Sequence, residues 1–299
     1  MNRLLSVNFA RLKKNKLFWI GFIGMFAFGA GMSLTSYFRG QQAGYQPAII
    51  NDVFFFHVNV IGFVAAAFCS LFLSTEYREG AIRNKLIVGH TRASVYLSNL
   101  IVNSVAILMM NISYTLAVCI VGLPLLGNFV GIDTIVVLKL FGINILATLS
   151  YTALFTLIGM INQNNAMVTI ISVLIALVLL FVSPLINEKL LEPKVNAAVE
   201  GVPGTNEMRI VSEEPNPYYI DGAKRSLYQF LEDFLPSGQF MQIIKNTETG
   251  REEDIAPEIL LGIIELKEPN YIKVSAYSLL LITVTTGIGI FVFGKRDLK

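Results

Sequence analysis

The sequence EYREGAIRNKLIVGHTR at residues 76–92 is a charged segment between two long apolar runs, residues 53–75 and 93–131. Each run is long enough to cross a bilayer, whose hydrocarbon core needs about 20 apolar residues in a helix. Residues 76–92 are therefore predicted to form the polar tip of a transmembrane hairpin, exposed at one membrane surface.

A short helix is predicted within this segment. Glu76, Gly80 and Arg83 recur at helical spacing on one face, and Glu79 can pair with Arg83 one turn later. Gly89 follows three apolar residues and is typical of the residue that ends a helix. An ordinary solvated loop with arginines at the lipid surface is the alternative interpretation.

The composition indicates a polytopic membrane protein. Of the 299 residues, 54% are hydrophobic and 15% are charged, whereas soluble domains carry about 25% charged residues. Cys69 and Cys119 lie inside apolar runs, which favours small buried side chains over a disulfide or metal site.

Six membrane spans are predicted from the apolar runs. They cover residues 17–38, 53–75, 95–121, 135–161, 166–185 and 274–294. The fourth and fifth are divided at residues 162–165, because the uncharged run 140–187 is too long for one helix. The first run resembles a signal peptide, but its length favours a retained span.

Two sets of residues predict how spans pack together. A small-residue stripe suited to close helix contact lies on the first span at Gly21, Gly24, Ala27 and Gly31. Amides suited to hydrogen bonds between helices, or less often to a polar path, lie on the third span at Asn99, Asn103 and Asn111.

Residues 1–16 predict an amphipathic helix that lies on the membrane. Leu5, Phe9 and Leu12 share its apolar face. The basic residues that would face anionic headgroups are Arg3, Arg11, Lys13, Lys14 and Lys16. A basic flank that only sets the topology is the alternative.

The segment 187–273 differs sharply from the rest of the chain. Residues 188–273 contain 16 acidic and 9 basic residues, a net charge near −7. They cannot cross the membrane, because a charge at mid-bilayer costs about 2.5–3.5 kcal/mol. We predict an aqueous acidic lobe with a loop at 202–219, candidate helices at 226–234 and 257–266, and a break at 235–238.

Lysine and arginine are dense before the first span, after the second and after the sixth. The positive-inside rule places these three regions in the cytoplasm, so both termini are cytoplasmic and the acidic lobe is extracellular. The expected location is the plasma membrane, as a multi-pass protein in contact with lipid.

Motifs for catalysis are missing from the sequence. It contains no phosphate-binding loop, no His-Glu-x-x-His motif and no Gly-x-Ser-x-Gly motif. The two histidines, His57 and His90, lie on opposite membrane sides in the predicted topology. We therefore expect no enzyme activity, no metal and no cofactor in this chain, and no binding to nucleic acid.

The charged segment resembles the membrane subunit of ABC type-2 exporters. The similar features are an acidic residue that closes the second span, followed by Glu-Gly-x-x-Arg-Asn-x-Leu-x-x-Gly-x-x-Arg. The resemblance implies an all-α polytopic fold with six transmembrane helices. Its parts would be an interfacial connecting helix (1–16), spans one to five (17–186), a coupling helix (about 78–89), an extracellular lobe (187–273), and span six with a basic tail (274–299).

In this family the coupling helix docks into a groove on a separate ATPase subunit. The resemblance implies two ATPase copies that bind ATP and Mg²⁺, and a second permease chain, identical or homologous. The coupling residues that it implies are Glu76, Tyr77, Glu79, Gly80, Arg83, Asn84, Gly89 and Arg92. The implied function is ATP-driven export of a hydrophobic or amphipathic substrate, such as a peptide, drug or lipid-like molecule.

One feature departs from the family, because many members have only a short re-entrant hairpin between spans five and six. Either 226–238 or 257–266 could be the re-entrant part here. A sensory or scaffolding protein whose acidic lobe binds a cationic peptide is the alternative function. An ion-driven carrier is disfavoured, because the spans contain no acidic residue for a coupling ion.

Overall fold

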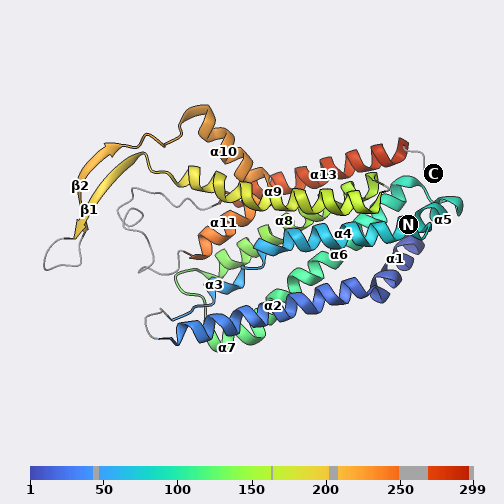
Figure 1. Ribbon diagram of the computed structural model, residues 1–299, viewed down its shortest axis with the longest axis horizontal. Helices are drawn as coiled ribbons and strands as arrows, with labels where there is room; N and C mark the ends of the chain where they lie inside the picture. Colours follow the sequence, from blue (N-terminus) through green and yellow to red (C-terminus); the bar gives the residue numbers. More distant parts are fainter. Residues whose placement is uncertain (43–46, 163, 202–207, 249–268, 296–299) are drawn as a thin grey trace.

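The computed structural model is a bundle of long helices with a β-hairpin that projects from one end (Figure 1). The structure describes residues 1–42, 47–162, 164–201, 208–248 and 269–295. Among these residues, six helices are long and apolar enough to cross a membrane: Lys16–Gly40, Asn51–Arg78, Arg92–Leu126, Thr134–Ile161, Ala166–Leu191 and Tyr271–Lys295. The predicted all-α polytopic fold with six spans is therefore confirmed.

Several spans contain more than one helical element. The helices are α1 (Asn2–Lys14), α2 (Lys16–Gly40), α3 (Asn51–Phe54), α4 (Val58–Arg78), α5 (Ala81–Ile87), α6 (Arg92–Ala117), the π-helix η1 (Val118–Gly122), α7 (Leu123–Leu126), α8 (Thr134–Ile161), α9 (Asn165–Leu191), α10 (Gly222–Phe234), α11 (Pro236–Glu248) and α13 (Tyr271–Lys295). Strands β1 (Val195–Gly201) and β2 (Met208–Pro215) pair antiparallel.

The two ends of the bundle differ (Figure 1). Helices α1 and α5 lie at one end, together with the N-terminus, and we call this the α5 end. Helices α3, α7 and α11 lie toward the opposite end, beyond which β1 and β2 project, and we call this the hairpin end. The two regions that the sequence singles out, the charged tip and the acidic segment, are therefore separated by the length of the spans.

Side-chain caps start several helices. Asn15 separates α1 from α2, and its side-chain oxygen accepts the backbone N–H groups of Leu17 (2.8 Å) and Phe18 (3.3 Å). Asn164 accepts two backbone N–H groups in the same way at the start of α9. These amides satisfy donors that have no partner inside the first helical turn, so the predicted division at residues 162–165 corresponds to a capped helix start.

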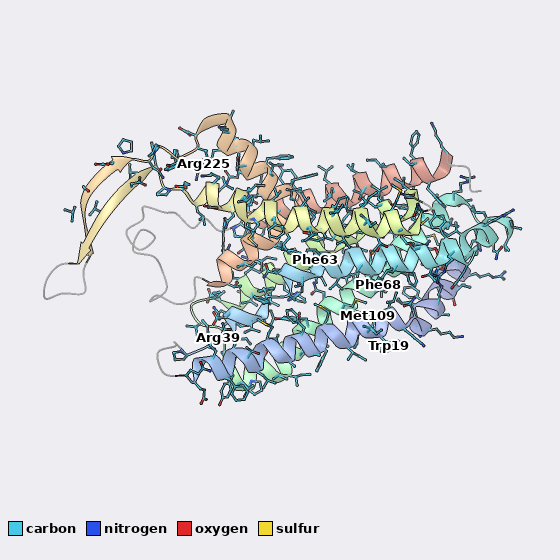
Figure 2. The ribbon with its side chains drawn as sticks, in the orientation of Figure 1. Trp19, Arg39, Phe63, Phe68, Met109 and Arg225 are labelled. Atoms are coloured by element: carbon cyan, nitrogen blue, oxygen red, sulfur yellow. The ribbon has the colours of Figure 1, made fainter. Side chains whose placement is uncertain are left out.

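Helix α8 lies at the centre of the bundle and packs against α4, α6, α9, α11 and α13. Leu140, Ala147 and Phe155 are fully buried along it. The outside of the bundle is apolar (Figure 2), where Trp19 of α2 and Met109 of α6 are exposed. Such an apolar exterior fits contact with lipid.

Helix α2 packs along α6 with a face that differs from the predicted stripe. A Cβ added at Gly29 would lie 2.8 Å from the carbonyl oxygen of Tyr114, so this glycine permits close contact. Gly21 also faces α6, but Gly24 and Gly31 have nothing within 4 Å of an added Cβ. The stripe is thus only partly right, because the buried face follows the helical repeat of Met25, Gly29 and Ser33.

The asparagines of α6 form hydrogen bonds between helices, as predicted. Asn103 Nδ2 donates to Thr156 Oγ1 (3.0 Å), and Asn111 exchanges two hydrogen bonds with Asn144 at 3.2 and 3.0 Å. Asn99 bonds to Glu76 at the α5 end. These side chains pair α6 with α8 and α4 in the core, so they do not line a path.

The part of the acidic segment that the structure describes contains a projecting hairpin and two helices that pack on the bundle. Helices α10 and α11 contact each other and α9, and α11 also contacts α8. Arg225 of α10 donates to the carbonyl oxygen of Leu190 at 3.0 Å (Figure 2). Of the two candidate re-entrant segments, residues 226–238 therefore fall in the α10–α11 pair, whereas 257–266 lie outside the described residues.

Four features differ here from the sequence predictions. The predicted loop at 202–219 contains strand β2, and the helix α11 was not predicted. The break at 235–238 is only one residue, Leu235, because α11 begins directly at Pro236. Proline is tolerated at a first helical position, where its missing N–H would have no partner. Helix α9 also continues to Leu191, past the predicted end at 185.

Candidate functional site

The charged tip contains two helices rather than one. Helix α4 ends at Arg78, and Gly80 has a left-handed conformation with φ of 66° before α5 begins. The prediction that Glu76, Gly80 and Arg83 share one helical face is therefore wrong, because Gly80 interrupts the helical repeat. Within the described residues Glu79 and Arg83 form no salt bridge, and both are exposed.

Gly89 ends α5 as predicted. Its φ is 95°, and its N–H donates to the carbonyl oxygen of Leu86 at 3.0 Å, while the N–H of His90 donates to that of Lys85 at 3.1 Å. This pair of bonds is the Schellman pattern, in which a left-handed glycine follows the last helical residue. Gly80 and Gly89 together fix where α5 begins and ends.

Glu76 lies at the end of α4 and is fully buried. Its Oε1 forms salt bridges with Arg11 (2.5 Å) and with Lys85. Its Oε2 accepts a hydrogen bond from Asn99 Nδ2 at 2.7 Å. A buried carboxylate persists only with such compensation, because removing an ion from water costs several kcal/mol; these bonds set the positions of all three partners.

Asn8 extends this set of contacts into α1. Its Nδ2 donates to Asn99 Oδ1 (3.0 Å) and to Ser98 Oγ (2.9 Å), and its Oδ1 accepts from Lys85 Nζ (2.7 Å). Asn8, Arg11, Glu76, Lys85 and Asn99 make up what we call the Glu76 cluster. It joins α1, α4, α5 and α6 through side chains alone.

The Glu76 cluster has two cations and one carboxylate. Burial lowers the pKa of the Lys85 ammonium, and Arg11 lowers it further, while Glu76 acts in the opposite direction. The Arg11 guanidinium also lies 4.3 Å from the centre of the Phe72 ring and donates to the Phe72 carbonyl oxygen at 2.7 Å. Removal of the Glu76 charge would leave Arg11 and Lys85 close together without their shared counter-ion.

Two other predicted coupling residues face the spans. Tyr77 Oη donates to the carbonyl oxygen of Met160 in α8 at 2.7 Å. Arg92 donates to the carbonyl oxygen of Phe293 in α13 at 3.1 Å. The tip is thus bonded to both α8 and α13, in addition to the contacts of the Glu76 cluster.

Helix α5 has one face toward the bundle and one face away from it. Ile82 is buried and Lys85 reaches into the Glu76 cluster. The opposite face carries Arg83, Asn84, Ile87 and Val88, and we call these four residues the α5 outer face. Ile87 and Val88 are 72% and 77% exposed. Sequence reasoning missed this apolar pair, although two aliphatic residues at a charged membrane tip are a signal for a partner.

The basic residues of α1 do not act alike. Arg3, Lys13 and Lys14 are exposed, whereas Arg11 is bound to Glu76. The buried face of α1 consists of Leu4, Asn8 and Leu12, with the predicted Leu5 and Phe9 only partly buried. The sequence signal for the contact with α6 was Asn8, because an asparagine on the apolar face of an amphipathic helix needs a polar partner.

Among the described residues, no group of three or more His, Cys, Asp and Glu could hold a metal ion.

The chain matches a known protein family over almost its whole length. Comparison with curated proteins finds no match to this sequence. The family model described as ABC-2 family transporter protein matches residues 9–298, which include the six spans and α5. The chain therefore belongs to the ABC-2 family of transporter proteins, as a membrane permease.

Proposed function

We propose that this chain is the permease of an ABC exporter, in which ATP hydrolysis by a separate subunit drives a hydrophobic or amphipathic substrate outward. Membership of the ABC-2 family supports partnership with an ABC ATPase. The observation that supports coupling is that α5 is a two-sided helix, bound to the spans on one side and open on the other. ATP and Mg²⁺ bind to the partner subunit.

The α5 outer face is the proposed docking surface for the ATPase. Ile87 and Val88 would enter an apolar groove, where burial contributes about 1.5–3 kcal/mol for each side chain. Arg83 and Asn84 flank them and would bond to polar groups at the rim of the groove. Glu79 is also exposed beside α5 and would lie at the edge of the same contact.

The Glu76 cluster is the proposed route by which movement of α5 reaches the spans. Lys85 of α5 is bound to Glu76 of α4 and Asn8 of α1, and Glu76 is bound to Asn99 of α6. Displacement of α5 would therefore pull on three other helices through short, charge-assisted bonds. Such a linkage carries force in both directions, so substrate in the spans would also affect the ATPase.

The proposed assembly contains two ATPase subunits and two permease chains in the plasma membrane. The α5 end faces the cytoplasm, with both termini of the chain, and the hairpin end faces outward. This orientation is supported by the exposed basic residues at the α5 end, Arg3, Lys13, Lys14, Arg78 and Arg83. It places the docking surface on the side of the membrane that contains ATP.

Docking is tested by co-purification of the permease with its co-expressed ATPase. We expect Arg83→Glu and Val88→Ser to reduce recovery of the ATPase and its turnover of ATP. Val211→Ser is the matched control, because Val211 is also an exposed valine (51%) but lies on β2 at the hairpin end. Normal assembly and ATP turnover in both α5 variants would show that the docking assignment is wrong.

A further inference from the structure

The second span is broken near the hairpin end. Helix α3 ends at Phe54 and α4 begins at Val58, and the intervening turn has short-range bonds. The N–H of Phe56 donates to the Val53 carbonyl oxygen (3.1 Å), and that of Val58 donates to the Phe55 carbonyl oxygen (3.0 Å). Continuous α-helical bonds between residues four apart are interrupted here, so the direction of the chain can change with little loss of helix bonding.

A side chain from another helix holds this break. Tyr114 of α6 is fully buried, and its Oη donates to the carbonyl oxygen of Val53 at 2.7 Å. The His57 ring lies against the Tyr114 ring, with 4.6 Å between the ring centres. Val53 before the turn and His57 at its end therefore contact one tyrosine.

His57 is fixed from a second side by α8. Asn144 Nδ2 lies 3.3 Å from His57 Nε2. An amide nitrogen is a donor, so a hydrogen bond at this contact requires the ring nitrogen Nε2 to accept. Asn144 of α8 is itself hydrogen-bonded to Asn111 of α6. His57 therefore contacts an amide pair that joins α6 to α8.

Asn51 joins the short helix α3 to the neighbouring segments. Its Nδ2 donates to the carbonyl oxygens of Val130 (2.9 Å) and Thr247 (3.1 Å), and its Oδ1 accepts from the Val130 N–H (3.1 Å). Thr247 lies in the last turn of α11. Asn51 therefore bonds α3 to the end of α11 and to the segment after α7.

The third span also changes its geometry at this end. Residues Val118–Gly122 form the π-helix η1, which packs against α3 and α2. A π-helical turn inside an α-helix is uncommon and is frequently found at functional sites. Span two departs from α-helical geometry directly after α3, and span three does so at η1, which contacts α3.

We propose that residues 55–57 are a hinge, about which α3 swings with the segments bound to Asn51, and that Tyr114 is the positioning residue that holds the hinge closed. The inference rests on the proposed function, since ATP binding would supply the force through α4. The hydroxyl group of Tyr114 is the part that can release α3, because α6 holds Val53 through this one hydrogen bond. Swinging of α3 changes the width of the bundle at the hairpin end, where substrate would leave.

The hinge is tested with spin labels at Asp52 of α3 and Leu71 of α4, both exposed, after replacement of Cys69 and Cys119 by alanine. Distance distributions are measured in liposomes for the permease–ATPase complex, without nucleotide and after vanadate trapping. We expect the trapped complex to populate a second distance. A control pair at Leu71 and Leu138 spans two unbroken helices, α4 and α8, and should keep one distance.

Tyr114→Phe removes only the hydroxyl group, and we expect it to raise the population of the second distance severalfold without nucleotide. Tyr96→Phe is the matched control, because Tyr96 is a buried tyrosine of the same helix whose hydroxyl group has no hydrogen-bond partner among the described residues. It should leave the distribution unchanged.

One unchanging distance in both nucleotide states, in a complex that hydrolyses ATP and exports substrate, would overturn the hinge and leave the proposed function intact. An equal effect of Tyr96→Phe would also overturn the role of Tyr114. If the ATPase does not couple to this chain, the Tyr114→Phe distribution of the permease alone still tests the hinge, since that measurement needs no nucleotide.

Discussion

A buried carboxylate such as Glu76 contributes little to stability in itself, because desolvation offsets most of its attraction to Arg11 and Lys85. Its effect is on position, since the three charges compensate one another only when α1, α4 and α5 keep their arrangement. Loss of one partner is much more costly than loss of the whole set. We therefore expect the Glu76 cluster to favour one arrangement of these helices at the α5 end.

Glu76→Gln should lower the unfolding midpoint of the purified permease. The amide keeps a bond to Asn99 but leaves Arg11 and Lys85 without a counter-ion, which costs about 3–5 kcal/mol. Lys85→Met in the same chain should restore part of the loss, because it removes one of the two unpaired cations. Glu79→Gln, at an exposed glutamate of the same tip, should have no effect. Thermal unfolding in detergent measures all three, and additive effects of the first two changes would contradict the cluster.

At the scale of elements, α5 has two faces with different contacts, which the sequence alone does not distinguish. One face binds the spans, and the other is exposed. Residues 78–89 were predicted as one coupling helix, and the helix α5 does lie there. Which residues face outward depends on the left-handed Gly80, which shifts the phase of α5 relative to α4. Two of the three partners of Glu76, Arg11 and Asn99, come from α1 and α6. Asn8 and Ser98, which bond beside them, are 90 residues apart in sequence. Local periodicity contains no information about such contacts.

The spans themselves were predictable, because length and apolarity alone define a helix that crosses a bilayer. Helix α11 was not, because Pro236 and Gly238 are signals for a break in any local reading. Gly238 is needed for contact, since an added Cβ would lie 2.3 Å from the Glu232 carbonyl oxygen. Only the packed structure distinguishes a glycine that ends a helix from one that permits two helices to meet.

Lys85→Ala and Arg83→Glu should give different defects. Arg83 lies on the α5 outer face, so its reversal should weaken binding of the ATPase. Lys85 faces the Glu76 cluster, so its truncation should leave binding intact but reduce transport per ATP hydrolysed. Co-purification, ATP turnover and substrate efflux from the same preparation separate these outcomes. Equal loss of ATPase binding in both variants would contradict the two-sided description of α5.

Gly238→Ala should destabilise the permease by about 1–3 kcal/mol, the usual cost of overpacking. The added methyl group would meet the backbone of Glu232, with 2.7 Å to its Cα, so α10 and α11 must move apart. Gly142→Ala is the matched control in α8, because nothing lies within 4 Å of its added Cβ. Alanine favours a helix over glycine by up to about 1 kcal/mol, so this control should be neutral or stabilising. Denaturant unfolding of both variants provides the measurement.

At the scale of the whole molecule, a series of buried polar contacts follows α6 from one end of the bundle to the other. It begins with Asn99 and Glu76 at the α5 end, continues with Asn103 and Thr156, and ends with Asn111 and Asn144 beside His57. Interhelical hydrogen bonds in membranes are individually modest, at about 0.6 kcal/mol on average. The last two pairs join α6 to α8 and set the register between these helices, whereas Asn99 and Glu76 join α6 to α4. Under the proposed coupling, a displacement at α5 would reach both interfaces.

The proposed orientation, with the α5 end in the cytoplasm, can be tested with one label at each end of the bundle. Val88 directly follows α5, and Val211 lies on β2. Single cysteines at these two positions, in a chain whose native cysteines are alanine, therefore place one exposed label at each end. On intact cells, a membrane-impermeant maleimide should modify the cysteine at 211, and should reach that at 88 only after permeabilisation. Both positions are exposed valines in the chain alone, so in cells that express it without the ATPase a difference in labelling reports side and not burial. Labelling at 88 on intact cells would put α5 outside the cell, away from ATP, and no cytoplasmic ATPase could then drive this permease through it.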